Sequence, residues 1–282
     1  MSFVNASGAR LYVEETGSGY PVVFVHELYS DCREWEAQVR WFSRSYRCVT
    51  FNARGYPPSD VPTDPNLYGY QYAVDDIAAV MRGLGIAKAH IVGLSMGAYA
   101  ALLFGLKHPD MASAIVAAAV GSGSPATDRA EFVASADASA KAYLQQGAAA
   151  MAESVGSGPT RKQLQRKDPR GFEAFLQHLR EHSPEGMAHT LSRYQAQRPS
   201  LYDFEAEFAK LRIPVLLIAG DEDAPCLETS LFLKKTIPNA GLWICPHTGH
   251  GINLEEPAAF NAMVDEFLCQ VPLPMSGGDR LI

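Results

Sequence analysis

Short apolar segments that alternate with helical patterns constrain the fold of this chain more than any other feature of its sequence. The segments lie at 22–25, 48–51, 90–92, 113–119, 213–218 and 242–245. Continuous apolar runs of this kind are typical of parallel strands that are buried on both faces. Helical spacing of apolar residues occurs between them, at 31–44, 71–84, 96–107, 227–235 and 256–269. The alternation predicts an α/β fold with a doubly wound, mostly parallel sheet.

Two further strands and one insertion complete the predicted architecture. Apolar residues at 3–4 and 11–13 flank turn residues, which predicts an opening hairpin and brings the sheet to eight strands. The alternation stops at Gly121, and 121–204 shows helical patterns but no strand. Because 282 residues suffice for one large domain, we expect a core at 1–120 and 205–282 with a helical insertion at 121–204. The tail, 271–282, shows no periodicity, and we expect it to pack on the surface or to be disordered.

The pentapeptide GLSMG at 93–97 lies at the junction of a predicted strand and a predicted helix. A G-x-S-x-G motif in this setting holds its serine on a tight, strained turn, where side chains at the glycine positions would collide. The turn lifts the Ser95 hydroxyl clear of the sheet and places it at a helix N-terminus, which favours developing negative charge. The motif is short, and an ordinary helix-capping serine is the alternative. The strand–turn–helix setting favours Ser95 as a nucleophile.

A serine hydroxyl needs a base and an orienting carboxylate to attack near neutral pH, and two loops offer them. The segment GDED at 220–223 follows the strand at 213–218, and HTGH at 247–250 follows the strand at 242–245. Loops that follow parallel strands share the carboxyl edge of the sheet with the Ser95 turn. The order along the chain is therefore serine, acid, histidine, with several acids and two histidines as candidates.

These motifs resemble those of the α/β-hydrolase fold family. Two further features of this chain match the family, a histidine loop, VHEL at 25–28, and a helical cap inserted after the sixth strand. The family places its acid three residues after the loop glycine, which implies Asp223, and its base directly after a glycine, which implies His250. Asp221 and Glu222 are then helix-capping or solvated acids. The resemblance implies a serine hydrolase that acts through a Ser-His-Asp triad and an acyl-enzyme, without a cofactor or a metal.

The resemblance also implies an oxyanion hole and a set of residues near the substrate. In the family, the hole is formed by the N–H of the residue after the nucleophile and by one N–H of the early histidine loop. In this chain these residues are Met96 and Leu28. Tyr29, Glu27 and Cys226 are expected to border the substrate.

Glu27 stands where the family usually has glycine, so a carboxylate lies beside a site that must stabilise negative charge. One explanation is that Glu27 points away and holds its loop through backbone amides or through an arginine such as Arg54. The other is a gate, in which the carboxylate contacts the resting Ser95 and moves when substrate enters. Both explanations fit the sequence.

The family branches into carboxylesterases, lactonases and hydrolases that cleave carbon–carbon bonds of ring-fission products, all with the same triad. A carboxylated substrate needs a cation in the site. The basic residues of the insertion mostly lie in polar stretches that look solvated: Lys141, Arg161, Lys162, Arg166, Lys167, Arg170, Arg180, Arg193 and Arg198. We therefore predict that a small uncharged ester or lactone is preferred to a carboxylated dienone. Carbon–carbon bond hydrolysis is the alternative.

Two other function classes compete with hydrolysis by the triad. The segment HLREH at 178–182 matches the H-x-x-E-H pattern of an inverted zinc peptidase. It lies in polar helical sequence without an evident acidic third ligand, so a solvated helix face is favoured over a metal site made by His178 and His182. The second is a non-catalytic ligand receptor on the same fold, against which the complete triad argues.

Composition narrows the partners and the location. With 31 acidic and 24 basic residues and no run of like charges, nucleic acid is not an expected partner. No nucleotide-binding glycine motif occurs, and the five cysteines show neither a disulfide framework nor zinc-ligand spacing. Because the sequence has no signal-like start and no membrane-length apolar segment, we expect a cytoplasmic protein without a membrane partner. It should bind a small-molecule substrate, and a homodimer is one assembly that the sequence allows.

Overall fold

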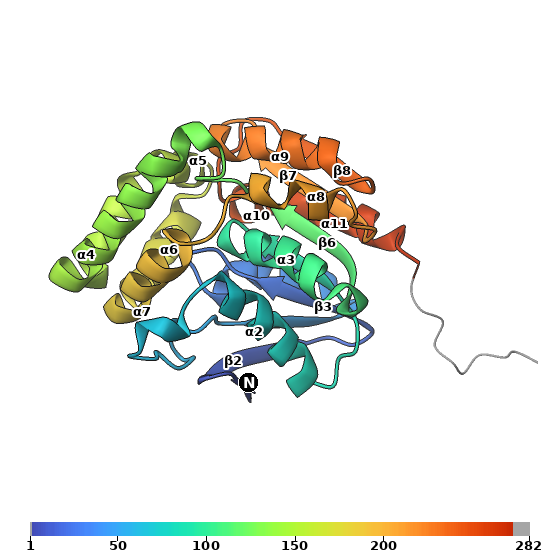
Figure 1. The fold of residues 1–282 in the computed structure, drawn as a ribbon, viewed down its shortest axis with the longest axis horizontal. Coiled ribbons are helices and arrows are strands. Elements are labelled where there is room, and N and C mark those ends of the chain that lie inside the picture. Colours follow the sequence, from blue (N-terminus) through green and yellow to red (C-terminus); the bar gives the residue numbers. More distant parts are fainter. Residues whose placement is uncertain (1, 273–282) are drawn as a thin grey trace, which may run out of the picture.

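The computed structural model describes residues 2–272, which contain one eight-stranded sheet (Figure 1). Its strands are β1 Ser2–Ala6, β2 Ala9–Thr16, β3 Tyr20–Val25, β4 Tyr46–Phe51, β5 Ala89–Leu94, β6 Ala112–Ala118, β7 Val215–Gly220 and β8 Ala240–Cys245. They lie side by side in the order β1-β2-β4-β3-β5-β6-β7-β8. The β1–β2 and β2–β4 pairs are antiparallel, and the other pairs are parallel. The predicted fold class, a doubly wound and mostly parallel sheet, is confirmed.

Helices cover both faces of the sheet. The helices of the α/β core are α1 Glu36–Phe42, α2 Tyr70–Gly83, α3 Met96–Lys107, α9 Ala224–Thr236, α10 Ile252–Glu255 and α11 Pro257–Cys269. Side chains of α2, α3 and α9 share one apolar cluster, and those of α1 and α11 share another. In β5, Ile91 joins the first cluster and Val92 the second, because successive strand side chains point to opposite faces. Burial on both faces explains the continuous apolar runs of the sequence.

Several short 3-10 turns connect these elements. They lie at Cys32–Trp35, Pro65–Leu67, Pro109–Met111, Pro159–Arg161 and Leu201–Phe204. The predicted helix at 31–44 is thus a 3-10 turn followed by α1. Asp31 caps the turn, since its side chain accepts a hydrogen bond from Arg33 N.

The chain between β6 and β7 is helical. It contains α4 Ala126–Ser157, α5 Lys162–Lys167, α6 Pro169–Arg180, α7 Pro184–His189, a π-helical segment Thr190–Gln195 and α8 Glu205–Phe208. In Figure 1, α4, α6 and α7 form a group at one side of the sheet. Hydrogen bonds from this segment to Glu27 and Met96 place it against the carboxyl ends of β3 and β5.

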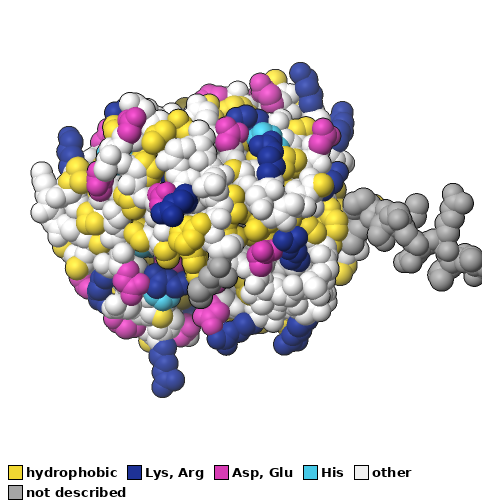
Figure 2. All heavy atoms as spheres, turned by 90° about the horizontal axis from the view of Figure 1, so that it is seen from below, with side chains coloured by type: hydrophobic (Ala, Val, Ile, Leu, Met, Phe, Trp, Pro, Cys, Tyr) yellow, Lys and Arg dark blue, Asp and Glu magenta, His cyan; other side chains and the backbone are white. Residues whose placement is uncertain are grey.

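Four further observations concern the surface, the helices, the cysteines and the tail. Charges of both signs are interspersed on the face drawn in Figure 2. Among residues 2–272, no helix combines the length and the apolar character that crossing a membrane requires. All five cysteines are free thiols, and Cys269 is the exposed one. Of the tail at 271–282, residues 273–282 lie outside the described residues, and Val271 is buried.

Candidate active site

Ser95 occupies the turn between β5 and α3. Its φ of 52° lies in a region that residues with a side chain rarely adopt. A Cβ at Gly93 would collide with the Gly97 carbonyl, and a Cβ at Gly97 would collide with the Val25 carbonyl. Both glycines are therefore required for the close approach of β3, β5 and α3 that holds the strained turn.

Ser95, His250 and Asp223 form one hydrogen-bonded line at the carboxyl edge of the sheet. Ser95 Oγ lies 2.8 Å from His250 Nε2, and His250 Nδ1 lies 2.8 Å from Asp223 Oδ2. Asp223 follows β7 and precedes α9, and His250 lies in the loop after β8. Because an ionised carboxylate only accepts hydrogen bonds, Nδ1 carries the proton and Nε2 can accept the hydroxyl proton of Ser95. The structure thus brings together the three residues that the family resemblance implied.

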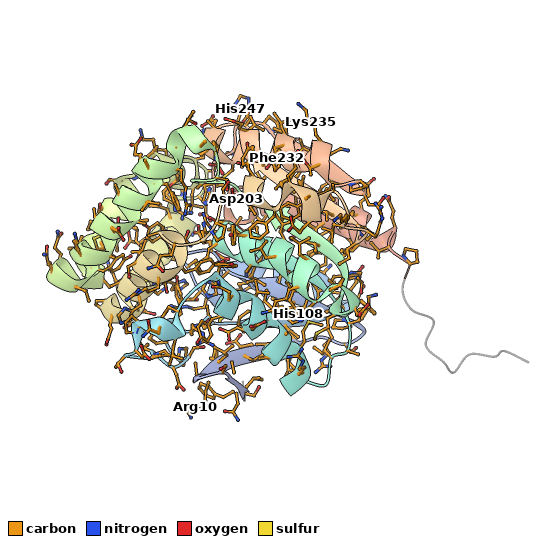
Figure 3. All side chains as sticks on the ribbon, viewed as in Figure 1. Arg10, His108, Asp203, Phe232, Lys235 and His247 are labelled. Carbon is orange, nitrogen blue, oxygen red and sulfur yellow. The ribbon has the colours of Figure 1, made fainter. Side chains whose placement is uncertain are left out.

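The neighbouring acid and histidine candidates lie elsewhere. His247 is exposed, and its side chain points outward at the edge of the molecule (Figure 3). Asp221 and Glu222 are exposed as well. Asp221 accepts a hydrogen bond of 3.1 Å from Thr248 N, and Glu222 accepts one from a glutamine of α5. Both carboxylates therefore hold loops and make no bond to His250.

Burial and charge together set the protonation of the acid and the base. Burial alone would lower the pKa of His250, but the charge and hydrogen bond of Asp223 outweigh it, so this pKa lies well above its ordinary value. For Asp223, burial raises the pKa, but the charge and hydrogen bond of His250 lower it by more, so this pKa lies below its ordinary value. Asp223 therefore stays ionised, and His250 gains proton affinity at the nitrogen that faces Ser95.

Glu255 holds the loop that carries His250. Its buried carboxylate accepts hydrogen bonds from Gly249 N at 2.6 Å and from Gly251 N at 3.1 Å, the residues on either side of His250. The sequence did not indicate this role, because Glu255 is one of two adjacent acids with no motif of its own.

Glu255→Gln is expected to lower kcat on a short-chain ester by up to about a hundredfold, since small misplacements of a catalytic group have effects of this size. The amide keeps the shape of the carboxylate but accepts through one oxygen only, so one of the two backbone N–H groups loses its partner. Steady-state kinetics measures the change, with half-exposed Glu256→Gln as the matched control. Equal kcat values for the two variants would show that the loop does not depend on Glu255.

Met96 and Leu28, the expected oxyanion-hole residues, both lie near Ser95. Met96 is the first residue of α3, where backbone N–H groups have no acceptor within the helix. Leu28 lines the same cavity as Ser95. The Leu28 carbonyl accepts from Tyr56 OH at 2.7 Å, and the Met96 carbonyl accepts from Tyr194 OH at 3.0 Å. These two bonds fix the backbone at both positions.

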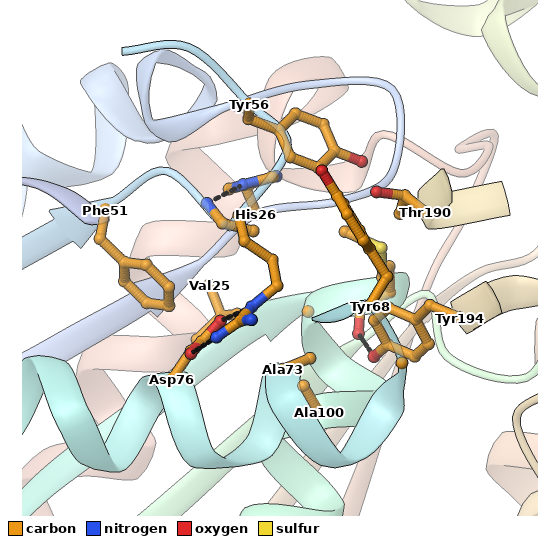
Figure 4. A pocket seen from close by; sticks show the side chains of 15 residues that line it. Val25, His26, Phe51, Tyr56, Tyr68, Ala73, Asp76, Ala100, Thr190 and Tyr194 are labelled. Carbon is orange, nitrogen blue, oxygen red and sulfur yellow. Dashed lines mark hydrogen bonds and ion pairs between the residues drawn. The ribbon is translucent and has the colours of Figure 1, made fainter. Parts of the chain in front are cut away.

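Glu27 forms a buried ion pair with Arg161. Arg161 Nη2 lies 2.7 and 2.8 Å from the two carboxylate oxygens, and both side chains are 1% exposed. Glu27 Oε2 also lies 3.8 Å from His250 Nε2, so the carboxylate does not point away from the site. Glu27 is thus held by an arginine, as one explanation expected, but by Arg161 and not by the suggested Arg54. Arg54 pairs with Asp76 of α2 beside a smaller cavity (Figure 4).

Loss of one partner of this buried pair should destabilise the protein strongly. Arg161→Gln leaves Glu27 buried without its cation, and we expect the free energy of unfolding to fall by about 3–5 kcal/mol. Urea denaturation followed by circular dichroism measures the loss. The exposed Arg166→Gln serves as the control, with an expected change within about 0.5 kcal/mol. A loss no larger than that of the control would mean that the pair contributes little to folding.

Ser95 and His250 face a cavity of about 160 Å³, close to the roughly 150 Å³ of an engineered cavity that binds benzene. The core contributes Leu28 and Tyr29 to its lining. The helical insertion contributes mostly polar groups, namely the hydroxyls of Ser135, Ser139 and Thr160, the amide of Gln195, and the guanidinium groups of Arg161 and Arg198.

Two of the basic residues of the insertion are buried, although the polar stretches around them looked solvated. Arg161 and Arg198 are 1% and 5% exposed and line the catalytic cavity, whereas Lys162, Arg166 and Arg170 are exposed as expected. Arg161 bonds to Glu27 and Arg198 to the Ser122 carbonyl, 134 and 76 residues away in sequence, so the polar stretches around each arginine gave no sign of burial. The cavity thus carries two guanidinium groups that the sequence analysis did not place there, and the preference for an uncharged substrate stays a prediction.

Of the three residues expected to border the substrate, Tyr29 and Glu27 line the cavity, and Cys226 does not. Cys226 is fully buried in the first turn of α9, with Sγ 3.9 Å from His250 Nδ1. Because it follows Asp223 by less than one helical turn, its side chain packs beneath the acid and the base. The prediction for Cys226 was wrong.

His178 and His182 are not gathered with further metal ligands. Within residues 2–272, one group of three side chains could hold a metal ion, and it consists of Asp223, Cys226 and His250. His182 is buried, and its Nε2 lies 3.5 Å from Asp31 Oδ2 at the contact between α6 and the core. The H-x-x-E-H pattern thus contributes to packing between the insertion and the sheet.

Comparison with known proteins gives relatives for nearly the whole chain. A family model described as alpha/beta hydrolase fold matches residues 20–257. The 3-oxoadipate enol-lactonase 1 of Acinetobacter baylyi is 26% identical over 274 residues, which are 94% of this chain and 95% of the relative. A putative 2-succinyl-6-hydroxy-2,4-cyclohexadiene-1-carboxylate synthase of Bacillus subtilis is 25% identical over 272 residues, 94% and 97% of the two chains. Among solved structures, a thermophilic esterase from Thermogutta terrifontis with malate bound matches with a TM-score of 0.84 at 26% identity, covering 95% of this chain and 97% of its own.

Proposed function

Because the chain belongs to the alpha/beta hydrolase fold family, we propose that it is a serine hydrolase that cleaves a small carboxylic ester or lactone through an acyl-enzyme. The observation that carries this proposal is the hydrogen-bonded line from Ser95 through His250 to Asp223. The likeness to an esterase and to an enol-lactonase over nearly the whole chain supports it.

In the proposed mechanism, the Ser95 hydroxyl attacks the carbonyl carbon of the substrate while His250 Nε2 takes its proton. The bond from the carbonyl carbon to the leaving oxygen then breaks, and His250 gives the proton to that oxygen. Water attacks the acyl-enzyme in the second half of the reaction and transfers a proton to His250, which returns it to Ser95 as the acid is released. Asp223 stays ionised and stabilises the imidazolium in both halves.

We assign the oxyanion of the tetrahedral intermediates to the backbone N–H groups of Met96 and Leu28. The place of Met96 at the N-terminus of α3 supports the assignment, because the helix dipole favours negative charge there. In comparable enzymes, loss of one such donor lowers the rate by about a hundredfold or more.

We further propose that 121–204 acts as a cap over a core formed by 1–120 and 205–282. The support is that Arg161 and Tyr194 of this segment bond to Glu27 and Met96 of the core, and that residues of both parts line the cavity. A cap in this position supplies most of the substrate-facing polar groups and limits the access of water.

A panel of p-nitrophenyl esters from acetate to octanoate tests the proposed function. The eight-carbon acyl chain exceeds a cavity of about 160 Å³, so kcat/KM should be highest for acyl groups of about two to four carbons and should fall by about tenfold or more at octanoate. A steady rise toward octanoate would place the acyl group outside the cavity. Failure to hydrolyse any ester would contradict the proposal.

Carbon–carbon bond hydrolysis of a carboxylated dienone on the same triad is the second candidate. The burial of Arg161 and Arg198 beside the triad favours it, because a carboxylated substrate needs cations in the site. A kcat/KM at least about a hundredfold higher for a dienone than for the best ester would replace the first proposal by this one.

Activity is expected to survive dialysis against EDTA, since no step of the mechanism uses a metal ion. The measurement is kcat/KM on the best ester before and after dialysis. A loss that zinc restores would instead support a peptidase site at His178 and His182. Tight binding of esters without any turnover would support a ligand receptor.

A further inference from the structure

Arg198 places a positive charge at the catalytic cavity without an acidic partner. It is 5% exposed and lines the cavity together with Ser95 and His250. Its Nη2 donates to the Ser122 carbonyl at 2.8 Å, and its Cζ lies 4.6 Å from the centroid of the Tyr99 ring. Among residues 2–272, no carboxylate lies within ion-pair distance of its guanidinium.

The other charges around the cavity are matched by a partner. Arg161 pairs with Glu27, and His250 pairs with Asp223. A further cation, Arg129, donates to the Arg198 carbonyl. An unmatched buried charge is costly, and proteins retain one where a ligand supplies the missing charge or where it has another specific role.

Gln195 adds a second unused donor at the same cavity. It is 3% exposed, and its Nε2 donates to no protein atom within residues 2–272. Gln195 ends the π-helical segment Thr190–Gln195, so it lies three residues before Arg198 and lines the cavity with it. A buried amide without an acceptor is the second independent sign that a polar ligand group belongs here.

We propose that Arg198 and Gln195 form an anion subsite that binds a single carboxylate of the substrate, remote from the carbonyl that Ser95 attacks. The guanidinium supplies the charge and a planar fork that matches a carboxylate, and the amide supplies one further donor. Because Arg198 is one cation without a partner, we expect the substrate to carry one negative charge there. The cavity of about 160 Å³ limits the substrate to a compact acid. This inference rests on the proposed hydrolase function and adds to it the substrate class, a monoanionic ester or lactone.

The test compares charged and uncharged esters of the same shape. The probes are monomethyl esters of diacids with three to six carbons, each paired with the methyl ester in which a carboxamide replaces the free carboxylate. For at least one pair we expect kcat/KM to be at least about tenfold higher for the acid, as a charge-assisted hydrogen bond would give. Methanol release at constant pH measures both rates.

Variants assign the preference to Arg198. Arg198→Gln should reduce the acid-to-amide ratio to about one, mainly through KM, and Arg198→Lys should retain part of it because the charge remains. Exposed Arg170→Gln, which lies in the same insertion, should keep the full ratio. An unchanged ratio in Arg198→Gln would overturn the subsite.

A second measurement needs no variant and so remains informative if Arg198→Gln fails to fold. In the wild-type protein, free glutarate should compete with p-nitrophenyl acetate, and glutaramide should not. Equal inhibition by both, or equal turnover of acids and carboxamides, would overturn the anion subsite and leave the hydrolase proposal standing. Hydrolysis of no ester, together with a glutarate-dependent rise in Tm, would overturn the hydrolase proposal and retain the anion subsite.

Discussion

Ser95→Ala is expected to lower kcat on a short-chain p-nitrophenyl ester by about ten-thousandfold to a millionfold. The hydroxyl lies 2.8 Å from His250 Nε2 and is the group that would form the acyl-enzyme. Removing it abolishes the covalent route and leaves the residual catalysis that binding and oxyanion donors provide. Steady-state and single-turnover kinetics measure the loss.

Ser135→Ala is the matched control for this variant, because its hydroxyl lines the same cavity but lies outside the triad. It should keep nearly the wild-type kcat, and circular dichroism should show both variants folded. Wild-type activity in folded Ser95→Ala would remove Ser95 from the mechanism.

Asp223→Asn should lower kcat by about ten-thousandfold, as the loss of the orienting carboxylate does in a comparable triad. The amide cannot stabilise the imidazolium, and it can donate to Nδ1, which would leave the proton on the nitrogen that faces Ser95. Asp221→Asn is the control, since Asp221 is exposed and bonds to Thr248 N. If Asp221→Asn were the more damaging of the two, the acid would be misassigned.

The pH profile provides a separate readout of the same contact. Asp223 raises the pKa of His250, so the wild-type base is lost as the pH falls through that raised pKa. In Asp223→Asn, burial still lowers the pKa of His250, but the negative charge that raised this pKa is gone. The acidic limb of kcat/KM should therefore move to lower pH. An acidic limb at the same pH in both proteins would mean that Asp223 does not set the pKa of His250.

Most of the fold could be predicted from the sequence, because burial on both faces leaves continuous apolar runs at β5, β6 and β7. In a parallel sheet, the loops that follow β5, β7 and β8 lie at the same edge, so the topology brings Ser95, Asp223 and His250 together. The π-helical segment Thr190–Gln195 could not be predicted. Its residues are held by long-range contacts such as the Tyr194 hydroxyl on the Met96 carbonyl, 98 residues away.

The site could be predicted only as far as its motifs extend. Ser95 lies in a motif that requires glycine on both sides, and the structure shows the carbonyl contacts that require it. Arg161 and Arg198 lie in polar helical sequence like that of their exposed neighbours, and their burial depends on how the insertion packs on the core. Contacts across such sequence distances, Arg161 with Glu27 and Arg198 with the Ser122 carbonyl, leave no local pattern, so the sequence did not place these two arginines at the cavity.

Labelling by a fluorophosphonate probe tests the central claim most directly, because the probe forms a covalent bond with an activated serine. We expect a single adduct that peptide mass spectrometry assigns to Ser95, and we expect no adduct in Ser95→Ala or in His250→Ala. An adduct on another residue, or undiminished labelling of Ser95→Ala, would contradict the assignment of Ser95 as the nucleophile.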